Sequence, residues 1–141
     1  MKNKILIVTA MFYDEIGSDL FRYASKTIED PNTTKDGWVG ADIYPVDVPG
    51  VFEIPVMISK HIHKMDGAIA LGCVIKGETP HFEFISKASI DAIMKLSIEH
   101  KKPIGNGIIT CFNRKQALDR SSKNNNKGHE AAKAMLSLLK I

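Results

Sequence analysis

The sequence predicts an α/β fold, a three-layer α/β/α sandwich in which helices cover both faces of a four-stranded parallel sheet. Four apolar runs rich in β-branched residues, at 5–8, 41–48, 67–75 and 104–111, are typical of strands. Segments with helical spacing of apolar residues separate these runs. Strands separated by single helices run parallel, with right-handed crossovers, which gives the flavodoxin-like arrangement. A length of 141 residues fits one domain, which we expect over residues 1–141.

The first half of the chain supplies two strands and two helices. Residues 5–8 (ILIV) are apolar without alternation, as in a strand buried on both faces. A helix is predicted over 14–30, followed by a loop over 31–40 that contains Pro31 and Gly37. The strand at 41–48 contains Pro45, which cannot donate to a ladder and places this strand at a sheet edge. Residues 51–65 are predicted as a helix, with Pro55 tolerated near the first turn.

The second half repeats the alternation. Residues 67–75 (GAIALGCVI) predict a third buried strand, and residues 81–100 predict a long helix that Pro103 ends. The fourth strand is predicted at 104–111, followed by a short helix over 114–120. Residues 121–127 (SSKNNNK) predict a polar loop, and residues 128–140 predict a final helix.

Composition narrows the class of protein. Hydrophobic residues make up 44% and charged residues 25%, so the chain is expected to be globular and not disordered. No apolar run approaches the roughly 20 residues of a membrane span, and we expect neither a signal peptide nor a membrane partner. The two cysteines, Cys73 and Cys111, match no metal motif, which favours a reducing cytoplasm and no bound metal.

Charge is distributed unevenly along the chain. Residues 1–100 carry 10 basic and 14 acidic side chains, whereas residues 101–141 carry 9 basic and 2 acidic ones. A basic segment of this kind fits a nucleic acid, an anionic small molecule or a solvated surface. Nucleic-acid binding is disfavoured because Phe112 is the only aromatic residue of that segment. Glycine-rich nucleotide motifs and a serine elbow are absent from the sequence.

Candidate ligand-binding residues follow the predicted strands, at the edge of the sheet where open α/β folds bind ligands. Phe12 could stack on a planar ring or pack against a helix, and Glu53 could accept ligand hydrogen bonds or cap locally. The turn at 77–79 opens a helix, which is either a simple turn or an anion site. His81 in the next turn could transfer protons near neutral pH or serve as a surface cap.

Residues 48–55 (VPGVFEIP), 70–83 (ALGCVIKGETPHFE) and 126–132 (NKGHEAA) form three motifs, which together closely resemble the 6,7-dimethyl-8-ribityllumazine synthase family. Residues 48–55 (VPGVFEIP) are similar to that family's VPGAxEIP segment, and residues 126–132 (NKGHEAA) to its NKGxEAA segment. The longest match is residues 70–83 (ALGCVIKGETPHFE), which resemble ALGxVIRGxTxHxD/E. The resemblance implies condensation of 5-amino-6-(D-ribitylamino)uracil with 3,4-dihydroxy-2-butanone 4-phosphate to give the lumazine, phosphate and water. It implies no cofactor.

The resemblance also implies roles for residues that follow the first three strands. The pyrimidine ring would stack on Phe12, and the imidazole of His81 would be the general acid and base. The ribityl chain would be bound by the backbone of Val51 and Phe52 and by the carboxylate of Glu53. The uracil would be bound by the main chain of Cys73, Val74 and Ile75. The phosphate would be bound by Glu78 and Thr79.

In the family the site lies between adjacent subunits of a homopentamer, so a second set of residues would come from the neighbour. Arg120 would reach the phosphate, Lys127 the ribityl chain or phosphate, and Glu130 would be the acidic partner of His81. Asn106 stands where some members place a bulky apolar residue over the ring. A riboflavin synthase is the candidate protein partner for the product.

Two further departures from the family pattern bear on binding and assembly. Lys76 replaces an arginine of many members, which keeps the charge but loses bidentate geometry. The segment 120–127 (RSSKNNNK) lacks the glycine of the turn found in members that assemble capsids, and glycine permits the positive φ of such turns. We therefore expect a free pentamer and not a 60-subunit shell.

Overall fold

One parallel sheet of four strands organises the chain, with the strand order β2-β1-β3-β4. The computed structural model describes residues 2–30, 38 and 40–139. The sheet strands are β1 (Asn3–Ala10), β2 (Ala41–Val48), β3 (Gly67–Ile75) and β4 (Ile104–Cys111). The connecting elements are α1 (Asp14–Glu29), η1 (Val51–Glu53), α2 (Ile54–His61), η2 (Ile62–Lys64), α3 (His81–His100), α4 (Arg114–Arg120), β5 (Ser121–Ser122), β6 (Asn125–Asn126) and α5 (Lys127–Leu139).

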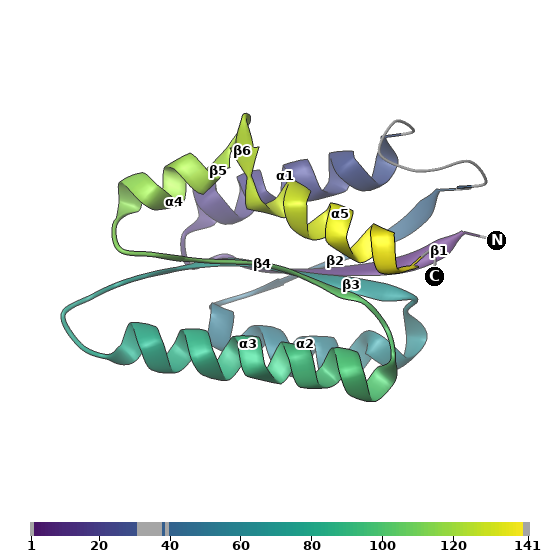
Figure 1. The fold of residues 1–141 in the computed structure, drawn as a ribbon, viewed down its shortest axis with the longest axis horizontal. Helices are drawn as coiled ribbons and strands as arrows, with labels where there is room; N and C mark the ends of the chain where they lie inside the picture. Colours follow the sequence, from purple (N-terminus) through teal and green to yellow (C-terminus); the bar gives the residue numbers. More distant parts are fainter. Residues whose placement is uncertain (1, 31–37, 39, 140–141) are drawn as a thin grey trace.

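Helices cover both faces of the sheet, which confirms the predicted three-layer α/β/α sandwich. Figure 1 shows α1 and α5 on one face and α2 and α3 on the other. The strands are parallel throughout the sheet, as predicted. β2 is an edge strand, as its Pro45 predicted. No helix among the described residues is both long and apolar enough to cross a membrane.

Two predicted elements differ in detail. The helix predicted over 51–65 consists of η1, α2 and η2, because 3-10 turns precede and follow the eight residues of α2. The polar loop predicted over 121–127 contains the short antiparallel pair β5–β6, and α5 begins at its last residue, Lys127. Most of the loop predicted over 31–40, and residue 140, lie outside the described residues.

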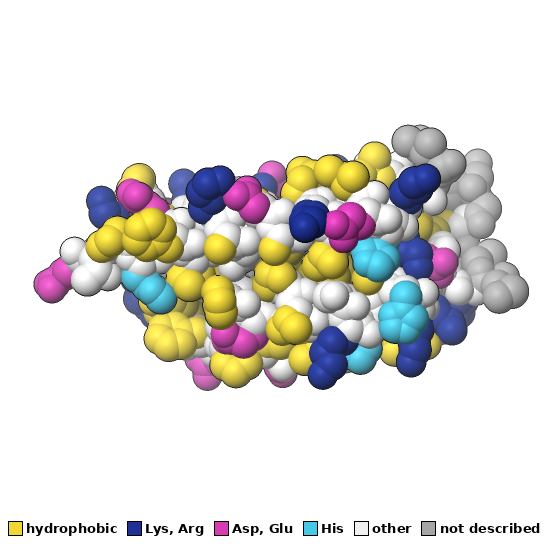
Figure 2. All heavy atoms as spheres, turned by 90° about the horizontal axis from the view of Figure 1, so that it is seen from below, with side chains coloured by type: hydrophobic (Ala, Val, Ile, Leu, Met, Phe, Trp, Pro, Cys, Tyr) yellow, Lys and Arg dark blue, Asp and Glu magenta, His cyan; other side chains and the backbone are white. Residues whose placement is uncertain are grey.

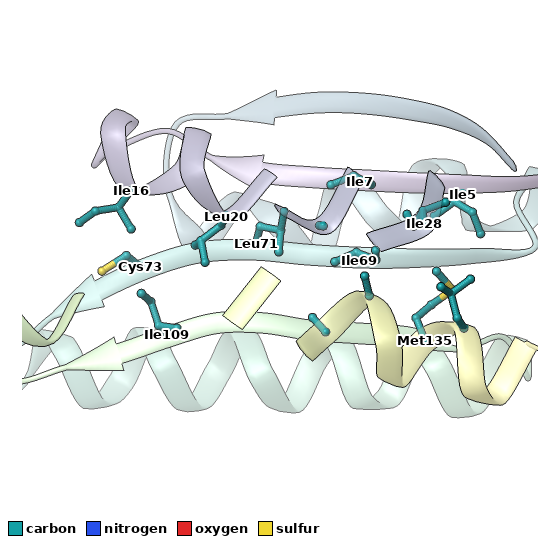
Figure 3. Close-up of a cluster of buried hydrophobic side chains, with 14 of the residues drawn as sticks. Ile5, Ile7, Ile16, Leu20, Ile28, Ile69, Leu71, Cys73, Ile109 and Met135 are labelled. Carbon is teal, nitrogen blue, oxygen red and sulfur yellow. The ribbon is translucent and has the colours of Figure 1, made fainter. Parts of the chain in front are cut away.

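The core is divided by the sheet into two apolar layers. Alternate residues of β1 enter opposite layers, with Ile5 and Ile7 facing α1 and α5, and Leu6 and Val8 facing α2 and α3. Figure 3 shows the first layer, in which side chains of α1, β1, β3, β4 and α5 meet. Each such aliphatic side chain stabilises the fold by about 1.5–3 kcal/mol. Burial on both faces explains why these strands read as continuous apolar runs.

The amino-terminal end of α5 lies directly against α1. A β-carbon on Gly128 would collide with the backbone carbonyl of Leu20 in α1. Any larger residue would therefore push these two helices apart. The glycine of the NKG sequence thus fixes where α5 begins relative to α1.

Candidate active site

A cavity of about 610 Å³ lies at the carboxyl ends of β1, β2 and β3. This is the sheet edge at which the sequence predicted ligand binding. Figure 2 shows hydrophobic side chains gathered toward this end of the α2–α3 face, with histidine and lysine more frequent toward the other end. The cavity is lined by Phe12, Tyr13, Gly50, Val51, Phe52, Glu53, Cys73, Val74, Ile75, His81 and Ile85.

The turn after β2 places a carboxylate in this first cavity. The Gly50 N–H donates to Oε1 of Glu53 at 2.9 Å, and the Glu53 N–H donates to the Gly50 carbonyl at 3.1 Å. Val51 is buried between them, and the Phe52 side chain is exposed. The capping role anticipated for Glu53 is therefore present, and its Oε1 is oriented by the backbone of its own turn.

The Phe12 ring is presented to solvent by the end of β1. Its side chain is 75% exposed, and its ring meets Tyr13 edge to face at a centroid distance of 4.9 Å. Packing against a helix would have buried this ring. An exposed aromatic face beside a cavity can stack on a planar ligand.

Cys73 forms part of the wall of the first cavity, at the end of β3. Burial, and then the neighbouring Cys111, raise the pKa of its thiol to about 12. The thiol is therefore neutral at physiological pH. Glu53 is the anionic side chain among the residues that line this cavity.

His81 begins α3 at the mouth of the cavity, and its side chain is exposed. Glu78 and Thr79 precede it in the exposed segment between β3 and α3 and do not line the cavity. A hydrogen bond of 2.8 Å from the Lys76 N–H to the Cys111 carbonyl fixes the start of this segment. Over the same end, the Lys76 ammonium lies 5.5 Å from the centre of the exposed Phe112 ring.

A second cavity, of about 400 Å³, runs along the free edge of β4, between α3 on one side and α4 and α5 on the other. Its lining is charged and polar. It is formed by Ile90, Asn106, Ile108, Ile109, Thr110, Arg120, Asn125, Lys127 and Glu130.

Two side chains of the second cavity cover backbone groups on the edge of β4. Oδ1 of Asn106 accepts a hydrogen bond from the Ile108 N–H at 3.1 Å, and Nη1 of Arg120 donates to the Thr110 carbonyl at 3.2 Å. Nη1 of Arg120 also lies 3.6 Å from Sγ of Cys111. An edge strand with its polar groups occupied in this way is less open to strand addition.

The structure sorts the predicted site residues into two groups. The first cavity brings together Phe12, Val51, Phe52, Glu53, Cys73, Val74, Ile75 and His81. The second contains Asn106, Arg120, Lys127 and Glu130. Within one chain, Glu130 therefore lies in a different cavity from His81.

Sequence reasoning missed several lining residues. Tyr13 and Gly50 flank Phe12 and Val51, so their proximity to predicted residues was an available signal. Ile85 and Ile90 carry no such signal, because they are apolar positions of α3 like any others. Among the described residues, no three His, Cys, Asp or Glu side chains come together as metal ligands would.

Comparison with known proteins gives one consistent result. Residues 2–141 match the family model described as 6,7-dimethyl-8-ribityllumazine synthase. The chain is 40% identical to 6,7-dimethyl-8-ribityllumazine synthase 1 of Rhodopseudomonas palustris, over 98% of this chain and 85% of that protein. It is 40% identical to a protein of the same description from Methylorubrum extorquens, over 98% and 80%. A third relative, from Bartonella tribocorum, is 37% identical over 99% and 90%.

Proposed function

The chain belongs to the 6,7-dimethyl-8-ribityllumazine synthase family, and we propose that two of its subunits together complete each active site. The enzyme is a transferase of riboflavin biosynthesis. It condenses 5-amino-6-(D-ribitylamino)uracil with 3,4-dihydroxy-2-butanone 4-phosphate to form the lumazine, phosphate and water.

One observation carries the proposal of a shared site. The charged residues Arg120, Lys127 and Glu130 gather on the edge of β4, whereas His81 stands over the first cavity. A neighbouring subunit that presents its β4 edge to the first cavity would unite the two groups. A ring of identical subunits repeats such a head-to-tail contact and closes on itself.

The outer face of α3 supports an assembly of this kind. Only Ser89 and Ile93 of its twenty residues are fully buried within the chain. Phe84, Met94 and Ile98 are exposed large apolar side chains on this helix. Apolar side chains in this arrangement are typical of a subunit interface, and we propose a homopentamer.

The first cavity would bind the ribitylaminouracil. The exposed ring of Phe12 would stack on the pyrimidine, and main-chain groups of Cys73, Val74 and Ile75 would contact the uracil edge. Glu53, with the backbone of Val51 and Phe52, would accept and donate hydrogen bonds to the ribityl hydroxyls.

The phosphate of the second substrate would lie where the two subunits meet. Glu78 and Thr79, before α3, would supply backbone N–H groups and a hydroxyl. The guanidinium of Arg120 from the neighbour would pair with the phosphate, and Lys127 would add a second cation. Asn106 of the neighbour would face the ring from the side opposite Phe12.

His81 would transfer the protons of the reaction. Imine formation requires a proton on the carbinolamine hydroxyl as it leaves, and phosphate loss and ring closure also require proton transfer nearby. Glu130 of the neighbour would hold the imidazole and favour its charged form. Much of the acceleration would come from holding two substrates together in the correct orientation.

Co-expression of two inactive chains tests the shared site. His81→Ala damages the first cavity and Arg120→Ala the second, and each alone should lose most activity. Mixed assemblies, purified through a different tag on each chain, should regain up to about a quarter of the wild-type sites, because each site takes its halves from two chains at random. Co-assembly of folded chains with no recovery would contradict the proposal.

The control is one variant alone, co-expressed as two copies that each carry a different tag. Its assemblies should stay inactive. Light scattering of the wild-type protein tests the pentamer, which should have a mass near five times the chain mass of 15.6 kDa. A particle near 60 subunits would contradict the free pentamer.

Two further proposals concern the setting of the enzyme. Cys73 and Cys111 are free thiols. Free thiols on adjacent strands persist in a reducing compartment, so we place the enzyme in the cytoplasm. Its product would be the substrate of a riboflavin synthase, which is the protein partner we propose.

A further inference from the structure

A single buried carboxamide, that of Asn126, joins three helices beside the second cavity. Asn126 is 5% exposed, at the end of β6. Its Oδ1 accepts hydrogen bonds from the N–H groups of Gly128 at 2.8 Å and His129 at 3.2 Å, which caps the start of α5. Its Nδ2 donates to the carbonyl of Ser121 at 2.8 Å, just after α4, and to that of Asp19 in α1 at 3.3 Å.

Two of the four partners of this side chain directly follow the cations of the second cavity. Ser121 directly follows Arg120, and Gly128 directly follows Lys127. One carboxamide therefore fixes the backbone next to the two side chains that face the β4 edge. The relative position of the ends of α4 and α5, and so of the two cations, is held by this link together with the β5–β6 pair.

The hydroxyls of the neighbouring residues Ser121 and Ser122 do not form a second side-chain link between α4 and α5. Oγ of Ser121 donates back into α4, to the carbonyls of Ala117 at 2.9 Å and Leu118 at 3.4 Å. Oγ of Ser122 likewise donates to Asp119 at 2.9 Å. These bonds end α4, whereas those of Asn126 cross from α4 to α5 and α1.

We infer that Asn126 is a positioning residue for the phosphate-binding cations Arg120 and Lys127. This inference rests on the proposed function, in which the neighbour's second cavity receives the phosphate of the butanone substrate. Asn126 touches neither substrate. It acts by holding the ends of α4 and α5 in register, so that two cations converge on one phosphate.

Asn126→Ser tests the inference. A serine oxygen still caps α5, but its hydroxyl is too short to reach the carbonyls of Ser121 and Asp19. The KM for butanone phosphate and the inhibition constant of inorganic phosphate should each rise about tenfold, because misplaced cations bind phosphate less well. The KM for ribitylaminouracil should stay within about twofold, because the first cavity is unchanged. A merely structural role would not separate the two substrates.

Asn113→Ala is the matched control. Asn113 caps α4 by accepting from the Gln116 N–H at 2.9 Å, and it lines neither cavity. Its loss removes a helix cap from the same segment without cutting the link between α4 and α5, so the two KM values should stay near wild type. If Asn126→Ser behaves like Asn113→Ala, the inference is wrong.

Arg120→Ala separates this inference from the proposed function. If Arg120→Ala leaves the KM for butanone phosphate unchanged, the proposed phosphate site is wrong. If Arg120→Ala raises that KM and Asn126→Ser does not, only the positioning role is wrong.

Hydrogen exchange on the wild-type protein provides a measurement that requires no variant. Saturating inorganic phosphate should slow exchange at the amides of Gly128 and His129, because phosphate held by both cations steadies the link. Slowing within 76–81 without slowing at these two amides would overturn the inference.

Discussion

The two cavities differ in which part of the fold builds them. The first is formed by the ends of three parallel strands, is lined mainly by apolar and aromatic side chains, and contains the carboxylate of Glu53. The second lies along one strand edge and takes Arg120, Lys127 and Glu130 from α4 and α5. A planar ring with a polyol suits the first cavity, and a phosphate suits the second. We propose that the fold divides two tasks between its sheet ends and its sheet edge: recognition of the ring and neutralisation of the phosphate.

The largest effect on activity should come from substitution of His81, at the mouth of the first cavity. His81→Ala should lower kcat roughly ten- to a thousandfold, because proton transfer is lost while positioning of both substrates remains. Steady-state kinetics that follow lumazine absorbance provide the measurement. His63→Ala is the control, because this histidine lies in η2 and lines neither cavity. An unchanged kcat would remove His81 from the mechanism.

Ionic strength should have a smaller effect on activity, and this effect should differ between the substrates of the two cavities. The KM for butanone phosphate should rise several-fold between about 0.05 M and 0.5 M salt, because salt screens exposed charges over roughly 4–14 Å in this range. The KM for ribitylaminouracil should change little, because its proposed binding in the first cavity depends on stacking and burial. Titration of each substrate at saturating levels of the other measures both values. Equal salt dependence of the two KM values would contradict the division of tasks.

The fold could be predicted almost completely from the sequence, for a physical reason. Strands buried on both faces are uninterrupted apolar runs, and α helices between them force parallel order, so β1, β3 and β4 were recognisable one by one. The division of the helix predicted over 51–65 into η1, α2 and η2 was not predictable. At their junctions, 3-10 turns and α helices share the same apolar spacing.

The first cavity was accessible to the same reasoning, whereas the second was not. The carboxyl ends of parallel strands meet at one edge, so Phe12, Glu53 and His81 could be grouped from topology. Asn106, Arg120 and Glu130 are scattered over three elements, and nothing in their spacing indicates that they meet; only resemblance to the family grouped them. Asn126 carried no signal as a positioning residue, because the hydrogen bonds that its buried carboxamide makes with three helices depend on tertiary packing.

The smallest effect concerns the thiol of Cys73 in the wall of the first cavity. Burial, and then Cys111, raise the pKa of the Cys73 thiol from its ordinary value of 9.0 to about 12. An acid whose folded pKa is raised contributes stability that is complete below its unfolded pKa and is lost as the pH rises toward the folded one. The window is therefore pH 9 to 12. Within it, the wild-type free energy of unfolding should fall by about 1 kcal/mol per pH unit on account of this thiol.

Cys73→Ala should remove that alkaline loss, because alanine has no proton to release. Urea unfolding at pH 8, 9 and 10 measures the slope of stability against pH. Ile109→Val, in the same apolar layer, is the packing control: it should lower stability by about 1 kcal/mol at every pH and keep the wild-type slope. If Cys73→Ala keeps the wild-type slope as well, ionisation of this thiol does not limit stability. The pKa of this thiol would then not be raised above its ordinary value of 9.0.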